Sequence, residues 1–172
     1  MKQNSAKKLT LALAIVYWIA LVWIVLFKAI EPWNVAELDR LREINWIPFH
    51  YETESPFHLS EVLLNVAIFV PFGLYLGLLD RGPVFSILAG AGFSLLMEAL
   101  QYTFAIGMTD VTDLLMNTLG TAVGYGIFAL LLLFVRDREK LRRILNIPAL
   151  ICTVLFFAFA AVLLIANRCT QK

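Results

Sequence analysis

Charged residues are scarce in this sequence. Asp, Glu, Lys and Arg make up 16% of its 172 residues, hydrophobic residues make up 60%, and the mean hydropathy is +0.80. A soluble domain typically has about 25% charged and 45–50% apolar residues, so the composition argues against an ordinary soluble protein. The apolar residues lie in blocks long enough to cross a bilayer, which predicts an integral membrane protein.

Cysteine and histidine are rarer still, with two of each. Cys152 and Cys169 would lie roughly 25 Å apart on a continuous helix, too far for a disulfide. No basic stretch is interleaved with aromatic residues, and no Ser-His-Asp, Cys-His or phosphate-binding pattern occurs. We therefore expect no nucleic-acid partner, and we find no recognised catalytic constellation.

Five apolar segments predict five transmembrane helices. Residues 9–27 carry no charge and follow three lysines. This apolar core is longer than that of a signal peptide, and no small-residue cleavage site follows it, so we expect a retained helix. The other four helices are predicted at residues 59–79, 84–104, 110–135 and 147–166. No internal repeat or second domain is visible, so residues 1–172 are predicted to form one all-α membrane bundle.

Residues 28–58, between the first two helices, are polar and are predicted to form a structured loop. Pro48 and Pro56 disfavour helix immediately before them, and each begins a Pro-Phe-His triplet. Earlier in the loop, four apolar residues recur at near-helical spacing among charges, which predicts a short helix on the membrane surface. These residues are Val35, Leu38, Leu41 and Ile44.

The distribution of basic residues predicts the orientation of the chain. Nine of the 14 Lys and Arg residues lie on one side of the membrane if the loops alternate, and all nine are in short segments. The positive-inside rule places that side in the cytoplasm. The N-terminus is then cytoplasmic, and the C-terminus and the 28–58 loop are outside. Nine of the 13 acidic residues are on or near the outer side.

Polar residues on three predicted helices fall at one depth. Asn65, Glu98 and Asn117 each lie six or seven residues from the outer end of their helix, which is roughly 9–10 Å below the boundary. Gln101 and Asp113 lie just above them. Ionisable residues inside membranes usually mark function or a paired structural contact, and a carboxylate there needs hydrogen-bond donors or a proton. We expect these residues to form a functional cluster with Asp110, the alternative being that they only hold helices together.

Helix capping is a simpler explanation for part of this pattern. Thr109 or Asp110 suits an N-cap, and Asp110-x-x-Asp113 is similar to a capping box. Gly120 and Gly124 form a GxxxG pattern, which lets a neighbouring helix approach closely. The acids of this segment are therefore either caps or members of the polar cluster.

Metal binding is a further alternative. Glu98, Asp110, Asp113, His50 and His58 provide oxygen and nitrogen ligands of the kinds that divalent ions accept. Their spacing matches no compact metal motif. We therefore expect no metal and no cofactor.

Several of these segments resemble the VanZ family of bacterial membrane proteins. The resemblance covers essentially the whole chain and is carried by residues 94–120 (SLLMEALQYTFAIGMTDVTDLLMNTLG), residues 65–73 (NVAIFVPFG), residues 24–28 (IVLFK) and the N-x-x-P-F motif of the loop. The residues at family motif positions include Asn45, Pro48, Phe49, Asn65, Pro71, Phe72, Gly73, Glu98, Gln101, Asp110, Asp113, Asn117 and Gly120.

The resemblance implies a multi-pass plasma-membrane protein associated with resistance to lipophilic glycopeptides such as teicoplanin, more than to vancomycin. The partners expected are membrane lipids, together with a lipoglycopeptide antibiotic or a cell-wall precursor lipid, and an oligomer is compatible with the sequence. Two other functions stay open. One is an enzyme that modifies a lipid or cell-wall precursor, with Glu98, Asp110 or Asp113 as general acid or base. The other is a small lipid or drug transporter, although five helices without an inverted repeat are few for one.

Overall fold

The computed structural model describes residues 2–26, 44–49, 56–105 and 109–170. They form five helices and a pair of two-residue strands. The elements are α1 (Lys2–Leu26), β1 (Ile44–Asn45), α2 (Pro56–Leu78), α3 (Pro83–Phe104), β2 (Thr109–Asp110), α4 (Val111–Val135) and α5 (Arg138–Thr170). Every helix contains a segment long and apolar enough to cross a membrane. The predicted all-α membrane bundle is therefore confirmed.

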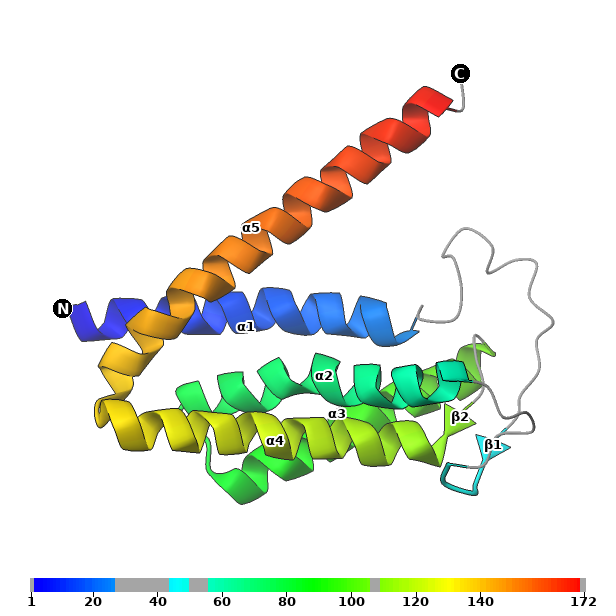
Figure 1. Ribbon diagram of the computed structural model, residues 1–172, viewed down its shortest axis with the longest axis horizontal. Coiled ribbons are helices and arrows are strands. Elements are labelled where there is room, and N and C mark those ends of the chain that lie inside the picture. The colour runs from blue at the N-terminus through cyan, green and yellow to red at the C-terminus, as the bar shows by residue number, and fades with distance from the viewer. Residues whose placement is uncertain (1, 27–43, 50–55, 106–108, 171–172) are drawn as a thin grey trace.

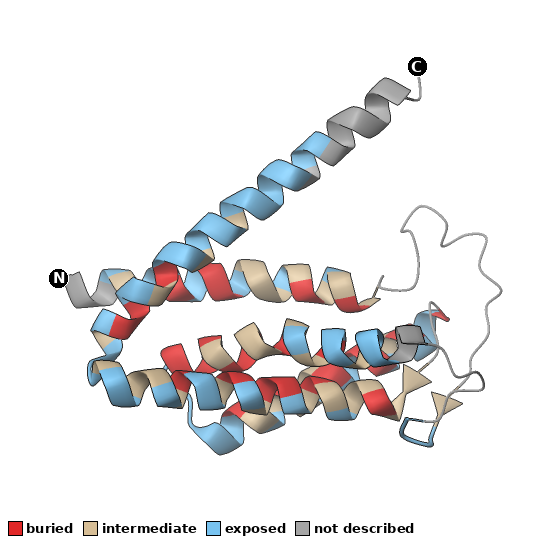
Figure 2. Cartoon of the chain, in the orientation of Figure 1, coloured by how far each residue is buried: buried red, intermediate tan, exposed pale blue. Residues whose placement is uncertain are grey.

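The first four helices lie side by side, and α5 crosses α1 and leans away from the bundle (Figure 1). Helix α2 packs most extensively against α4, which also contacts α3. Buried residues concentrate between these helices, whereas most residues of α5 whose burial is described are exposed (Figure 2). Large apolar side chains cover the outer faces of the bundle, as expected for helices that face lipid.

Glycines allow the backbones of α2 and α4 to touch. An added Cβ would lie 2.0 Å from the Thr121 carbonyl oxygen at Gly73, 2.3 Å from the Val66 carbonyl oxygen at Gly120, and 1.9 Å from the Val70 carbonyl oxygen at Gly124. None of these positions has room for a side chain. The predicted role of the GxxxG pattern in close helix approach is confirmed.

An aromatic core fills the space between the helix pair and its neighbours. The ring of Phe72, one of the motif residues, lies 5.7 Å from Trp18 of α1, 5.9 Å from Phe69 and 5.2 Å from Phe93 of α3. Helix α2 continues through Pro71. This core fixes the relative positions of α1, α2 and α3.

An ionic cluster, called the Asp80 cluster below, joins α1, α5 and the turn between α2 and α3 at one end of the bundle. Asp80, in the turn between α2 and α3, accepts from Lys7 at 2.6 Å, from Arg142 at 2.5 Å and from Arg138 at 3.2 Å. The Arg142 side chain is 5% exposed. It also pairs with Glu139 and donates from Nε to the Leu78 carbonyl at 2.7 Å. A buried arginine thus ties the start of α5 to the end of α2.

The predicted start of the fifth helix is wrong by nine residues. The sequence predicts this helix from residue 147, but α5 begins at Arg138 and includes most of the basic segment RDREKLRR (residues 136–143). Asp137 Oδ1 accepts from the backbone N–H of Glu139 and Lys140 at 2.8 and 3.2 Å, so it caps the helix. Helix α5 also continues to Thr170, beyond the predicted end at residue 166, so both cysteines lie on this one helix.

The first helix begins at Lys2, so it extends further than the predicted 9–27. The other three helix predictions agree with the structure to within a few residues. Residues 35–43 of the predicted surface helix lie outside the described residues. Its last residue, Ile44, is in strand β1 instead.

Candidate functional site

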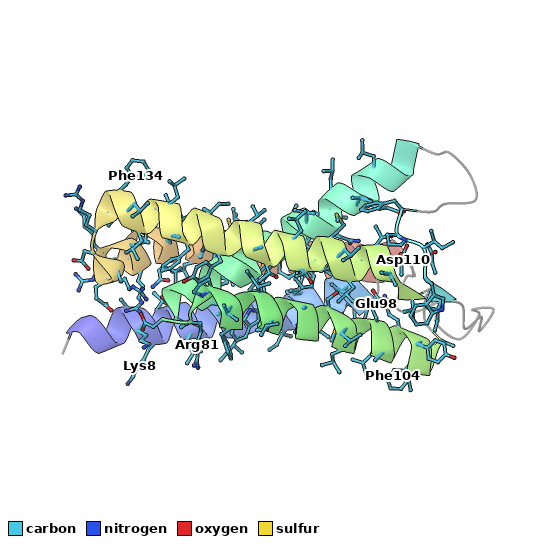
Figure 3. The ribbon with its side chains drawn as sticks, turned by 90° about the horizontal axis from the view of Figure 1, so that it is seen from below. Lys8, Arg81, Glu98, Phe104, Asp110 and Phe134 are labelled. Carbon is cyan, nitrogen blue, oxygen red and sulfur yellow. The ribbon has the colours of Figure 1, made fainter. Side chains whose placement is uncertain are left out.

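The six predicted site residues all lie at the end of the bundle opposite the Asp80 cluster. We call this group the polar cluster; it consists of Asn65, Glu98, Gln101, Asp110, Asp113 and Asn117. Four of them are at most 4% exposed, and Asp110 and Asp113 are half-buried. Glu98 and Asp110 lie near each other where α3 ends and α4 begins (Figure 3).

Asp110 connects three elements. Its Oδ1 accepts from the Thr112 backbone N–H at 2.7 Å and so caps α4, as predicted. Its own backbone N–H donates to Glu98 Oε2 of α3 at 3.1 Å. Its second carboxylate oxygen, Oδ2, accepts from Asn45 Nδ2 at 3.4 Å, and the two residues are paired in the parallel β1–β2 ladder. Asp110 is therefore both a cap and a junction.

The predicted capping box is wrong in its second half. A capping box requires Asp113 to accept from the backbone N–H of Asp110, but Glu98 occupies that donor. Asp113 instead accepts from Asn65 Nδ2 on α2. As a result, Glu98 links α3 to β2, and Asp113 links α4 to α2.

Asn117 pairs with a serine of α3 and not with the two residues predicted at its depth. Its Nδ2 donates to Ser94 Oγ of α3 at 2.9 Å, and both side chains are buried. We expected Asn117 to meet Glu98 and Asn65, but its side-chain amide donates to Ser94 instead. Ser94 lies four residues before Glu98 and thus on the same helix face, which is the signal that would have identified it.

Two amide oxygens of the polar cluster have no hydrogen-bond partner among the described residues. They are Gln101 Oε1 and Asn117 Oδ1, and both are buried. The amide nitrogen of Gln101 donates to the Val25 carbonyl of α1 at 3.0 Å. An unpaired buried polar group costs about 1–3 kcal/mol, and such groups are few in native proteins. The packing of the described helices therefore leaves two buried amide oxygens available to accept hydrogen bonds.

Part of the predicted outer loop is attached to the start of α4. The Phe49 backbone N–H donates to Thr112 Oγ1 at 3.0 Å, and Phe49 has a φ of 59°, an unusual value for a residue with a side chain. Trp46, Ile47 and Phe49 are all more than half exposed. Exposed aromatic residues of this kind are typical of the membrane–water interface.

The histidines of the metal hypothesis have undescribed side chains. His50 and the side chain of His58 lie outside the described part of the structure. Within the part of the chain that the structure describes, no three His, Cys, Asp or Glu side chains lie close enough together to hold a metal ion.

Comparison with known proteins places the chain in a family. The sequence profile described as VanZ/LLP1 matches residues 14–135. The chain belongs to the VanZ/LLP1 family. Protein VanZ of Enterococcus faecium is 31% identical to it over 162 residues, which cover 89% of this chain and 93% of that protein. No solved structure matches.

The range matched by the VanZ/LLP1 profile covers most of the bundle. It begins within α1 and ends at Val135, the last residue of α4. All six residues of the polar cluster and the three glycines between α2 and α4 lie inside it. The polar cluster and the glycine contact thus belong to the part of the chain that matches the VanZ/LLP1 profile, and α5 lies outside that part.

Proposed function

We propose that the chain contributes to resistance to lipoglycopeptide antibiotics such as teicoplanin, by means of the polar cluster at the outer leaflet. The observation that carries the proposal is the unused acceptor capacity of Gln101 and Asn117 inside a family-like helix bundle. Polar residues whose only role was helix packing would be expected to satisfy one another. A site that binds a donor-bearing ligand would keep such acceptors available.

The orientation in this proposal rests on charge. The Asp80 end of the bundle carries nine of the 14 basic residues of the sequence, so the positive-inside rule places it in the cytoplasm. The helices then present the polar cluster to the outer side, below the exposed residues Trp46, Ile47 and Phe49. The N-terminus is cytoplasmic and the C-terminus is outside.

The location of the polar cluster suits an amphiphilic drug. A lipoglycopeptide has an acyl chain that partitions into the outer leaflet and a polar peptide that stays at the interface. The exposed apolar side chains beside β1 would contact the drug at the interface. The carboxylates of Glu98, Asp110 and Asp113 and the free amide oxygens, which lie below them, would accept hydrogen bonds from N–H donors of the drug that reach beneath the interface.

The test is a comparison of charge-removing variants in a susceptible bacterium. Glu98→Gln and Asp113→Asn keep the size of each side chain, and we expect them to lower the minimum inhibitory concentration of teicoplanin to that of cells without the protein. Thr103→Val is a control on the same helix that should keep full resistance, because Thr103 is exposed and its hydroxyl donates to the Ala99 carbonyl of its own helix. Full resistance in both acidic variants, at normal protein levels, would contradict the proposal.

Two measurements separate this function from its rivals. An enzyme that modifies a lipid or cell-wall precursor would change the mass of that precursor in cells, and the Glu98→Gln variant would abolish the change. A transporter would move labelled lipid or drug across the membrane of reconstituted vesicles. We expect neither a mass change nor flux from a protein that acts by binding.

A further inference from the structure

A groove lies between α1 and α5 at the end of the bundle that contains the Asp80 cluster. Its volume is about 410 Å³, within the usual range of small-molecule sites, which is roughly 300–1,000 Å³. Leu9 of α1 and Ile147 and Leu150 of α5 form apolar walls, and Arg143 and Ser5 lie at its more polar end. The groove therefore combines apolar walls with a polar end, which would match the acyl chain and the headgroup of a membrane lipid.

Hydrogen bonds between the two helices hold the floor of the groove in place. Asn146 of α5 donates from Nδ2 to the Ala6 carbonyl of α1 at 3.1 Å, and its Oδ1 accepts from Thr10 Oγ1 at 2.9 Å. Thr10 and Asn146 are at most 3% exposed. Because both groups of the Asn146 amide are occupied, the floor is fixed and the open parts of the groove are its walls and its basic end.

Arg143 is a basic side chain without an acidic partner in the described part of the chain. The nearby carboxylates are already engaged, since Asp80 binds three basic residues and Glu139 pairs with the buried Arg142. Arg143 is exposed, and Lys140, three residues earlier, is also exposed and on a neighbouring part of the helix surface. The open end of the groove therefore carries uncompensated positive charge.

Charge and apolar surface are separated along the groove. Leu150 lies seven residues beyond Arg143 on α5, about 10 Å further along the helix. A guanidinium at the level of the lipid headgroups would donate to a phosphate, and the acyl chain would then lie beside Ile147, Leu150 and Leu9. We infer that this groove binds one anionic phospholipid, with Arg143 on its phosphate. The inference does not depend on the proposed function, because it concerns the opposite end of the bundle.

The test is lipid retention by the full-length protein in detergent, measured by native mass spectrometry. The probes are phosphatidylglycerol and phosphatidylcholine with identical acyl chains. We expect the protein to retain more phosphatidylglycerol, and Arg143→Gln to lower that retention about fivefold, the effect of one basic residue near an anionic lipid surface. Arg81→Gln is the matched control. It removes one charge at the same end of the bundle, but Arg81 does not line the groove and lies over the Phe85 ring at 5.2 Å. This control should change retention less than twofold.

A second variant tests the groove without changing any charge. Ser5→Trp replaces an exposed residue at the lip of the groove by a bulky ring, and it should also lower phosphatidylglycerol retention. If Arg143→Gln does not fold, this variant still decides the matter. The inference is overturned by equal retention of the two lipids, by an Arg81→Gln effect as large as that of Arg143→Gln, or by an unchanged Ser5→Trp variant.

Discussion

Alanine at Gly124 is expected to push α2 and α4 apart. The added Cβ would lie 1.9 Å from the Val70 carbonyl oxygen, and real Cβ contacts are essentially never below 3.0 Å. Both groups are attached to helix backbones, so neither can rotate out of the way. The two helices must therefore move apart. Gly73 and Gly120 lie in the same contact, where an added Cβ would be 2.0 and 2.3 Å from a carbonyl oxygen of the facing helix.

The expected loss of stability is about 2 kcal/mol. Adding a methyl group to a well-packed core costs about 1–3 kcal/mol, and contact with backbone places this case at the upper end. Alanine recovers roughly 0.5–1 kcal/mol because it restricts the unfolded chain more than glycine does. The net loss corresponds to a fall of roughly 4–8 °C in the melting temperature of a chain of this size.

Thermal unfolding of the purified protein in detergent, followed by tryptophan fluorescence, measures this loss. Gly126→Ala is the matched control, because Gly126 lies on the same helix with no atom within 4 Å of its added Cβ. We expect this control to melt at or slightly above the wild-type temperature. Equal melting temperatures for Gly124→Ala and Gly126→Ala would refute the close contact between α2 and α4.

Three further predictions concern the Asp80 cluster. Arg142→Met should destabilise the protein by about 2–3 kcal/mol, because the buried guanidinium bonds Asp80 and the Leu78 carbonyl. Arg138→Met, which removes an exposed partner of the same carboxylate, should cost less than about 1 kcal/mol in the same melts. Partial burial raises the pKa of Asp80, but Lys7, Arg142 and Arg138 outweigh this effect and hold the pKa below its ordinary value of 3.8. The stability that Asp80 contributes is therefore complete above pH 3.8 and lost as the pH falls through the lowered pKa, and Asp80→Asn should weaken the acid dependence of the melting temperature.

The helices were predictable because each depends on a local apolar run. Asp110 caps α4, a signal that is visible in the sequence, and α3 begins at Pro83, one residue before its predicted start. The start of α5 was not visible. Basic residues are rare inside membrane helices, and only the fold shows that Arg142 reaches Asp80, 62 residues away. The two-residue strands carry no pattern long enough to predict.

The sequence predicted which residues form the polar cluster but not how they pair. Helix rise placed Asn65, Glu98 and Asn117 at one depth, because depth depends only on distance along each helix. Hydrogen-bond partners depend also on the rotation of each helix about its axis. The glycine contact constrains that rotation between α2 and α4, and Gly90 of α3, where an added Cβ would lie 2.2 Å from Thr121 Oγ1, constrains it between α3 and α4. Asn65 thereby reaches Asp113, and Asn117 reaches Ser94.

The role of the polar cluster in lipoglycopeptide resistance is tested most directly by a susceptibility panel. Cells that express the wild-type chain, the Glu98→Gln variant or no protein are compared against teicoplanin, teicoplanin without its acyl chain, and vancomycin. We expect the wild-type chain to protect against intact teicoplanin alone, and Glu98→Gln to remove that protection. Equal protection against all three drugs, or full protection by the variant, would contradict it.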